Sequence, residues 1–161
     1  MTPVHPDTLS ALTSGIQSEV ASYVFYTEAA KRSDMSQVKS ILEELALEEK
    51  EHFHILERQY DSLIRSEKWI STADILKQEG LPEIGEEMTR EHRALIDEVG
   101  RADSPATVLD IAFRLEEEAN QLFSDAALRA ETADGKAMFE RLARFEEGHM
   151  NRIRQLQEEL D

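Results

Sequence analysis

Apolar residues recur every three or four positions along four stretches of the chain, and polar residues fill the positions between them. The four stretches cover residues 12–30, 38–56, 109–127 and 138–153. Spacings of three and four place side chains on one face of an α-helix. The pattern therefore predicts four amphipathic helices of about 24–30 residues each, roughly 36–45 Å long at the helical rise per residue.

The positions of the prolines group these helices into two hairpins. Proline occurs at residues 3, 6, 82 and 105, which leaves both long helical parts uninterrupted. We expect a single all-α domain over residues 1–161, with helical hairpins at residues 8–64 and 105–160. The connection at residues 65–104 is too long for a structureless loop. Its apolar residues predict a shorter extra helix over residues 84–99.

The two hairpins resemble each other in sequence. Shifting the first by 97 residues lays it on the second without a gap and gives ten identities between residues 19 and 52. The matched pairs are Glu19/Glu116, Ala29/Ala126, Ala30/Ala127, Arg32/Arg129, Lys39/Lys136, Glu43/Glu140, Leu45/Leu142, Ala46/Ala143, Glu49/Glu146 and His52/His149. The repeat predicts a four-helix bundle built from two duplicated hairpins and having approximate two-fold symmetry.

Composition and charge narrow the classes of function. The chain has 161 residues, no cysteine, and 18 basic against 34 acidic residues, for a net charge of −16. The charge argues against binding nucleic acid or an anionic membrane, and no apolar run approaches the ~18 residues of a membrane span. Because the first residues have neither the basic nor the apolar part of a secretion signal, we expect a cytoplasmic protein.

Six polar residues occupy stripe positions that a helical core would fill with apolar side chains. They are Glu19, Glu49, His52, Glu116, Glu146 and His149, and each histidine follows a glutamate by three residues on the same side of its helix. A buried ionised carboxylate is costly unless it is paired, protonated or bound to a cation. Without a cation, burial and mutual repulsion should raise the carboxylate pKa values. The six residues therefore predict a metal site, with a buried polar network as the alternative.

A second Glu-x-x-His pair overlaps the first, because glutamate is frequent in this chain. It consists of Glu51 and His54, and the repeat has Gly148 and Asn151 at the matching positions. The pair also falls, together with Arg58, on a different face of the helix. We therefore expect Glu51 and His54 to be solvated or interface residues and not ligands.

The ligand types indicate which metals the site would hold. Carboxylate oxygens combined with two imidazoles suit divalent iron or manganese, and zinc stays an alternative because it also binds nitrogen and oxygen ligands tightly. Four glutamates balance the charge of two divalent ions. We expect two divalent metal ions, with iron as the first choice.

At these residues the chain resembles the ferritin-like di-iron carboxylate proteins, and among them a rubrerythrin-type domain. The stretches that carry the resemblance are residues 19–26 with the following Ala29-Ala30, and residues 45–52. The resemblance covers about residues 10–64 and 106–160. The chain differs from the family in two respects. Ala119 stands where many rubrerythrins have a seventh ligand glutamate, and the chain lacks the cysteines of a rubredoxin domain.

The resemblance implies a role for each candidate residue. Glu49 and Glu146 would lie nearest both metals, Glu19 and Glu116 would complete the shell, and His52 and His149 would each cap one ion. Tyr26, two turns after Glu19, would hydrogen-bond a ligand carboxylate or shuttle an electron, the alternative being an aromatic core residue.

Three functions follow from these expectations. The first is a di-iron oxidoreductase that reduces peroxide or dioxygen, of peroxidase or ferroxidase type, with an external electron donor protein. The second is a metal-binding or iron-handling protein without significant turnover. The third is a helical interaction module whose glutamates form a polar network. Rubrerythrin-like bundles commonly pair, so we also expect a homodimer.

Overall fold

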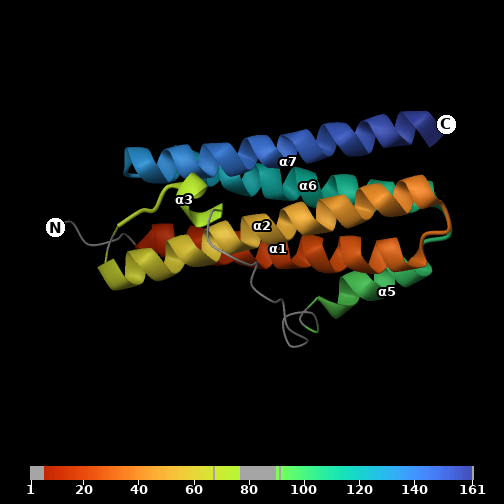
Figure 1. Cartoon of the computed structure of the whole chain (residues 1–161), viewed down its shortest axis with the longest axis horizontal. Helices are drawn as coiled ribbons and strands as arrows, with labels where there is room; N and C mark the ends of the chain where they lie inside the picture. The colour runs from red at the N-terminus through yellow and green to blue at the C-terminus, as the bar shows by residue number, and fades with distance from the viewer. Residues whose placement is uncertain (1–5, 67, 77–89, 91, 161) are drawn as a thin grey trace.

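Helices account for nearly all of the described chain. The computed structural model describes residues 6–66, 68–76, 90 and 92–160. Its helices are α1 (Pro6–Arg32), α2 (Ser36–Ser66), α3 (Thr72–Leu76), α5 (Arg93–Arg101), α6 (Pro105–Arg129) and α7 (Ala133–Leu160) (Figure 1). No strand occurs among the described residues, which confirms the predicted all-α class.

The four long helices have the predicted lengths, at 27, 31, 25 and 28 residues for α1, α2, α6 and α7. The start of α6 shows how the sequence sets a helix boundary. The Ser104 side chain accepts a hydrogen bond from the Thr107 backbone N–H at 3.2 Å, and Pro105 occupies the first turn. Serine satisfies an otherwise unpaired amide at this end, and proline has no amide to leave unpaired.

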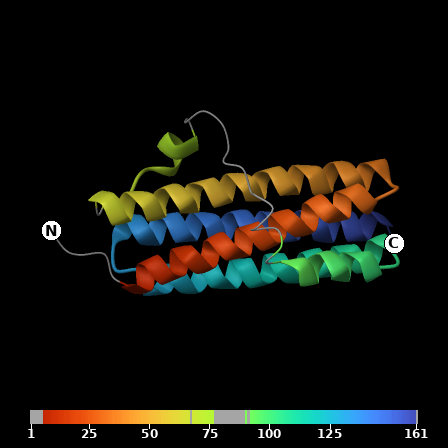
Figure 2. The ribbon, with the colours of Figure 1, turned by 90° about the horizontal axis from the view of Figure 1, so that it is seen from below.

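The helices form two antiparallel hairpins that pack against each other. Helices α1 and α2 make one hairpin and α6 and α7 the other, and all four run roughly along the long axis of the molecule (Figures 1 and 2). The end of α2 and the start of α6 lie at opposite ends of the bundle (Figure 1). The connection between the hairpins therefore spans the length of the bundle, as in ferritin-like folds with one long crossover.

The connection contains more structure than the sequence pattern predicts. The extra helix expected over residues 84–99 is observed as α5 at residues 93–101, while residues 84–89 and 91 lie outside the described part of the chain. Helix α5 packs on α1, and a two-pronged contact of Arg114 with Glu98, both bonds 3.1 Å long, ties it to α6. The short helix α3 was not predicted.

The apolar core consists of two main clusters, one toward each end of the bundle. One cluster includes Phe25, Leu42, Leu109 and Ile153. The other includes Leu12, Leu56, Phe123 and Phe139. Along every long helix the residues of these two clusters are separated by the polar stripe positions, so the six polar residues lie between two apolar regions. Among the described helices, none is long and apolar enough to cross a membrane.

Candidate metal centre

The structure brings all six predicted residues together in the middle of the bundle. One comes from α1, two from α2, one from α6 and two from α7. Every one is buried, with exposures of 0–4 %: Glu19, Glu49, His52, Glu116, Glu146 and His149. Because apolar clusters flank these residues on both sides along the helices, their charges are held away from water.

The six residues form two overlapping groups whose possible ligand atoms lie within 4.8 Å of one another. The first group is Glu19, Glu49, His52 and Glu146, and the second is Glu49, Glu116, Glu146 and His149. Glu49 and Glu146 belong to both groups. The shift of 97 residues that relates the two hairpins also converts the first group into the second, so the sequence repeat appears as symmetry of the site.

The two imidazole rings face the carboxylates through the same nitrogen. The Nδ1 atom of His52 lies 3.0 Å from Glu146 Oε1 and 3.6 Å from an oxygen of both Glu19 and Glu49. The Nδ1 atom of His149 lies 2.8 Å from Glu49 Oε1 and 3.3 Å from oxygens of Glu116 and Glu146. The two rings are nearly parallel, with centroids 5.6 Å apart and an interplanar angle of 15°.

Five carboxylate oxygens in this cluster are buried without a hydrogen-bond partner among the described residues. They are both oxygens of Glu19 and one each of Glu49, Glu116 and Glu146. Buried polar atoms in folded proteins are nearly always satisfied, and leaving one unsatisfied costs about 1–3 kcal/mol or more. Carboxylate oxygens and imidazole nitrogens are the ligands that divalent iron and manganese prefer. The donor set and its unsatisfied oxygens therefore fit a pair of divalent cations.

Burial raises the pKa of two of the glutamates. Desolvation, reinforced by the charges of Glu146 and Glu49, holds the pKa of Glu19 well above its usual 4.5. Desolvation and the charge of Glu146 raise the pKa of Glu116 to about 7. Both carboxyl groups therefore tend to keep a proton in the metal-free protein, as the sequence predicts for a shared buried site.

The prediction of a raised pKa is wrong for Glu146. Burial alone would raise it, but close contacts with Glu116, His149 and His52 lower the pKa of Glu146 to about 2. For His52, burial opposes the charged form, yet the hydrogen bond with Glu146 and the nearby carboxylate of Glu49 prevail and raise its pKa to about 10. Similar bonds raise the pKa of His149. Two imidazolium groups therefore balance part of the carboxylate charge, which the sequence pattern did not predict.

Tyr26 contacts the cluster through its hydroxyl group. The side chain is fully buried in the first apolar cluster, and the hydroxyl donates a hydrogen bond to Glu116 Oε1 at 2.6 Å. Burial and the charge of Glu116 hold the pKa of Tyr26 well above its usual 10, so the hydroxyl keeps its proton. Tyr26 thus fills the core and also makes the predicted bond to a carboxylate, while electron transfer through it stays a prediction.

Replacing Tyr26 by phenylalanine should test this hydrogen bond. Phe123 occupies the matching position of the repeat and is fully buried, which shows that the bundle accepts a phenylalanine ring there. Tyr26→Phe should cost about 0.5–1.5 kcal/mol, the usual net worth of such a bond. The thermal midpoint would then fall by roughly 2–4 °C per kcal/mol. Tyr23→Phe, which removes the hydroxyl of a half-buried tyrosine, is the matched control, and equal midpoints for the two variants would contradict the assignment.

Three residues around the histidines were missed by the sequence reasoning. Glu48 Oε2 lies 3.5 Å from His149 Nε2 and accepts a hydrogen bond from Arg152 at 2.5 Å. The contact with His149 is the main cause that lowers the pKa of Glu48 to about 2. The other histidine, His52, has an aromatic neighbour: the centroid of the Phe145 ring lies 5.1 Å from that of the His52 ring. The sequence offers no signal for these contacts, because Glu48 and Phe145 are one of many matched pairs that differ between the two hairpins.

The overlapping pair Glu51 and His54 belongs to neither group of possible ligands, as predicted. The expected exposure of His54 is wrong, however, because this residue is only 7 % exposed. Gln59 on the same helix is also buried, and its side chain hydrogen-bonds the backbone of Ile70 in both directions. Helix α2 is therefore covered on more sides than its apolar stripe indicates.

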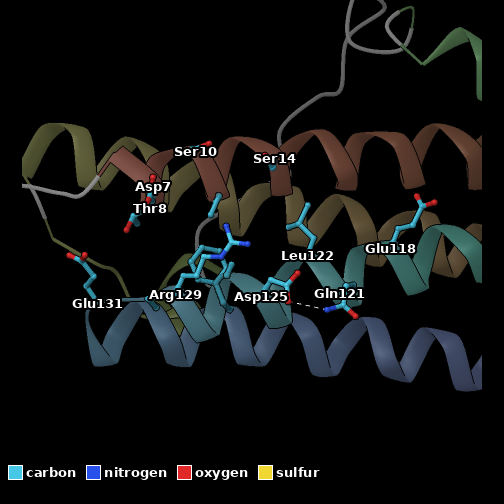
Figure 3. A pocket seen from close by; sticks show the side chains of 14 residues that line it. Asp7, Thr8, Ser10, Ser14, Glu118, Gln121, Leu122, Asp125, Arg129 and Glu131 are labelled. Atoms are coloured by element: carbon cyan, nitrogen blue, oxygen red, sulfur yellow. Dashed lines mark hydrogen bonds between the residues drawn. The ribbon is translucent and has the colours of Figure 1, made fainter.

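A surface hollow of about 540 Å³ lies apart from the cluster, between the first half of α1 and the second half of α6 (Figure 3). None of the six cluster residues lines it. Its labelled side chains are mostly polar, and Gln121 donates a hydrogen bond to Asp125 across one turn of α6 at 3.0 Å (Figure 3). The candidate metal centre is thus a buried cluster and not part of this hollow.

Comparison with known proteins gives one match. The family model described as Rubrerythrin matches residues 10–157, which include both hairpins and all six cluster residues. No curated protein and no solved structure matches the chain significantly.

Proposed function

This chain belongs to the rubrerythrin family, and we propose that it holds two divalent metal ions, of iron, between its four long helices. The ligands are Glu19, Glu49, His52, Glu116, Glu146 and His149. The observation that carries the proposal is the set of five buried carboxylate oxygens without a partner among the described residues. Glu49 and Glu146, which occur in both groups, would each serve both ions. Manganese and zinc are the alternatives, since the same ligands bind them.

The reaction we propose is the reduction of hydrogen peroxide or dioxygen, with oxidation of bound ferrous iron as the ferroxidase form of the same chemistry. Two ferrous ions supply two electrons, the number that converts one hydrogen peroxide molecule and two protons into two water molecules. The protein restricts what reaches this centre, because its histidine side chains are only 5 % exposed and its glutamates are more deeply buried. Such burial favours a very small substrate.

The chain's own residues hold the carboxylates and a nearby proton. The Tyr26 hydroxyl donates to Glu116 Oε1, which fixes one carboxylate and keeps a protonated group at the edge of the cluster. Glu19 differs, since neither of its oxygens has a hydrogen-bond partner in the described structure. Glu19 is therefore the carboxylate that its protein neighbours restrain least.

Turnover would also require an electron source. The chain contains no cysteine, so it has no thiolate with which to store electrons or bind an iron–sulfur cluster. We propose a separate redox protein as the donor. Pairing of two copies into a homodimer is part of the same proposal.

Stopped-flow mixing tests the reaction. Protein loaded anaerobically with two equivalents of ferrous ion should be oxidised by stoichiometric peroxide much faster than free ferrous ion in the same buffer. The control is Glu49→Gln, which lacks a carboxylate shared by both groups and should behave like free ferrous ion. Tight metal binding with no accelerated oxidation would instead support an iron-handling protein without significant turnover.

A further inference from the structure

The two histidines of the cluster have similar inner contacts and different outer ones. Both present Nδ1 to the carboxylates, which leaves Nε2 of each ring pointing away from them. On the outer side of His149 stands the carboxylate of Glu48, 3.5 Å from Nε2. Beside His52 the corresponding residue is Phe145, whose ring lies against the imidazole with centroids 5.1 Å apart and an interplanar angle of 34°. A shift of 97 residues relates Glu48 to Phe145. The two-fold symmetry of the six cluster residues therefore does not extend to the residues beside the two histidines.

Glu48 is held in place by an arginine from the opposite hairpin. Arg152 on α7 donates to Glu48 Oε2 at 2.5 Å and to Glu44 Oε2 at 2.9 Å, so one guanidinium group bridges two glutamates of α2. The side chains of Glu48 and Arg152 are partly exposed, at 41 % and 35 %, and that of Glu44 is more exposed, at 62 %. A multidentate arginine pair has a better defined geometry than an isolated surface ion pair.

Among the described residues, no matching carboxylate and arginine stand beside His52. In the repeat, Phe145 takes the place of Glu48, the buried Ile55 takes the place of Arg152, and Arg141 takes the place of Glu44. An aromatic ring offers no carboxylate to accept a hydrogen bond from the imidazole. The side of His52 therefore lacks both a counterpart of the acceptor Glu48 and a counterpart of Arg152, which holds that acceptor in place.

An outer carboxylate changes how a histidine binds metal. Accepting the N–H of the outer nitrogen fixes the tautomer and the ring orientation and makes the metal-facing nitrogen more basic, and losing this partner typically costs about 10–100-fold in metal affinity. We propose that Glu48, held by Arg152, is a positioning residue for His149 and makes the two metal positions unequal. The position bounded by His149 and Glu116 then fills first, and the position bounded by His52 and Glu19 fills second. This inference rests on the proposed dinuclear centre.

Anaerobic titration with cobalt(II), followed by calorimetry and by the visible absorption of the ion, tests the inequality. The wild-type protein should bind two equivalents in two steps that differ about tenfold or more in affinity. His149→Ala should remove the tighter step and His52→Ala the weaker one, which assigns each step to its position. Glu48→Gln should weaken the tighter step by about 10–100-fold and leave the weaker step unchanged.

Two further variants separate positioning from general stabilisation. Glu43→Gln removes the same charge from an exposed position of the same helix and should leave both steps unchanged. Arg152→Gln breaks the contact between the hairpins while leaving Glu48 beside His149, so it should weaken the tighter step less than Glu48→Gln does. If Glu48→Gln weakened both binding steps equally, Glu48 and Arg152 would have a merely structural role. The same conclusion would follow if Arg152→Gln weakened the tighter step as much as Glu48→Gln does.

The titration also distinguishes failure of this inference from failure of the proposed function. Two equivalents bound with equal affinity in the wild-type protein would overturn the inequality and leave the dinuclear centre intact. Absence of tight binding in the wild-type protein would overturn both.

Discussion

Glu49→Gln and Glu146→Gln are each expected to weaken the binding of two divalent ions by more than about 100-fold. Each of these glutamates belongs to both groups of possible ligands, so removing either charge affects both metal positions at once. The loss should therefore exceed the 10–100-fold that is typical when only an outer partner of a ligand is removed. Glutamine keeps the size of the side chain, which limits any change in packing.

The chain provides a close control for this result. Glu51 lies two residues from Glu49 on the same helix, is half-buried, and belongs to neither group. Glu51→Gln changes the net charge by the same amount and should leave both the affinity and the number of bound ions unchanged. Anaerobic titration with ferrous or manganous ion measures all three variants, and an equal loss in Glu51→Gln would refute the assignment of ligands.

The metal-free protein is expected to lose stability as pH rises above about 4.5, and added metal should restore it. Glu116 has its pKa raised from 4.5 to about 7, and His52 from 6.5 to about 10. Between each pair of values the folded chain binds a proton that the unfolded chain has released, so the free energy of unfolding falls as pH rises. Glu146, with a pKa lowered to about 2, contributes in the opposite direction and only in acid, below pH 4.5.

Metal binding should reverse this loss, because two divalent ions replace the protons and screen the carboxylates from one another. The unfolded chain has no preformed site, so binding energy adds to the free energy of unfolding. At a free metal concentration 100 times Kd, each site contributes about 2.7 kcal/mol. Two such sites would raise the thermal midpoint by on the order of 10–20 °C in a domain of this size.

Thermal unfolding of the metal-free and manganous protein at pH 6 and pH 8 measures the effect. The metal-dependent rise in midpoint should occur at both pH values and be larger at pH 8, where fewer protons compete for the ligands. Glu49→Gln should show only a small rise. If metal left the thermal midpoint unchanged at both pH values, the glutamates would form a buried polar network and not a metal site.

The sequence was enough to predict the bundle and the residues that meet at its centre. Glu49 and Glu146 occupy matched positions of the repeat, each within an apolar stripe. Charged residues at such positions indicate that both side chains face the same bundle interior. The structure confirms the four long helices and gathers the six residues into two overlapping groups, in each of which the possible ligand atoms lie within 4.8 Å of one another. The spacing of three and four residues predicts both the core and the polar cluster, because the two lie on the same faces of the helices.

Other features depend on contacts that periodicity does not encode. Glu48 and Arg152 look like ordinary charged surface residues in sequence, and only the approach of α2 to α7 brings them together beside His149. The low pKa of Glu146 depends on contacts with residues of three different helices. The covered side of α2 at His54 likewise follows from the tertiary arrangement and not from the helical stripe.

Anomalous scattering at the iron edge, from crystals of the protein loaded anaerobically with ferrous ion, tests the dinuclear centre most directly. Two peaks should appear between the four long helices, both bordered by Glu49 and Glu146, with His149 at one and His52 at the other. A single peak there, or peaks confined to surface sites such as the hollow of Figure 3, would contradict the paired centre.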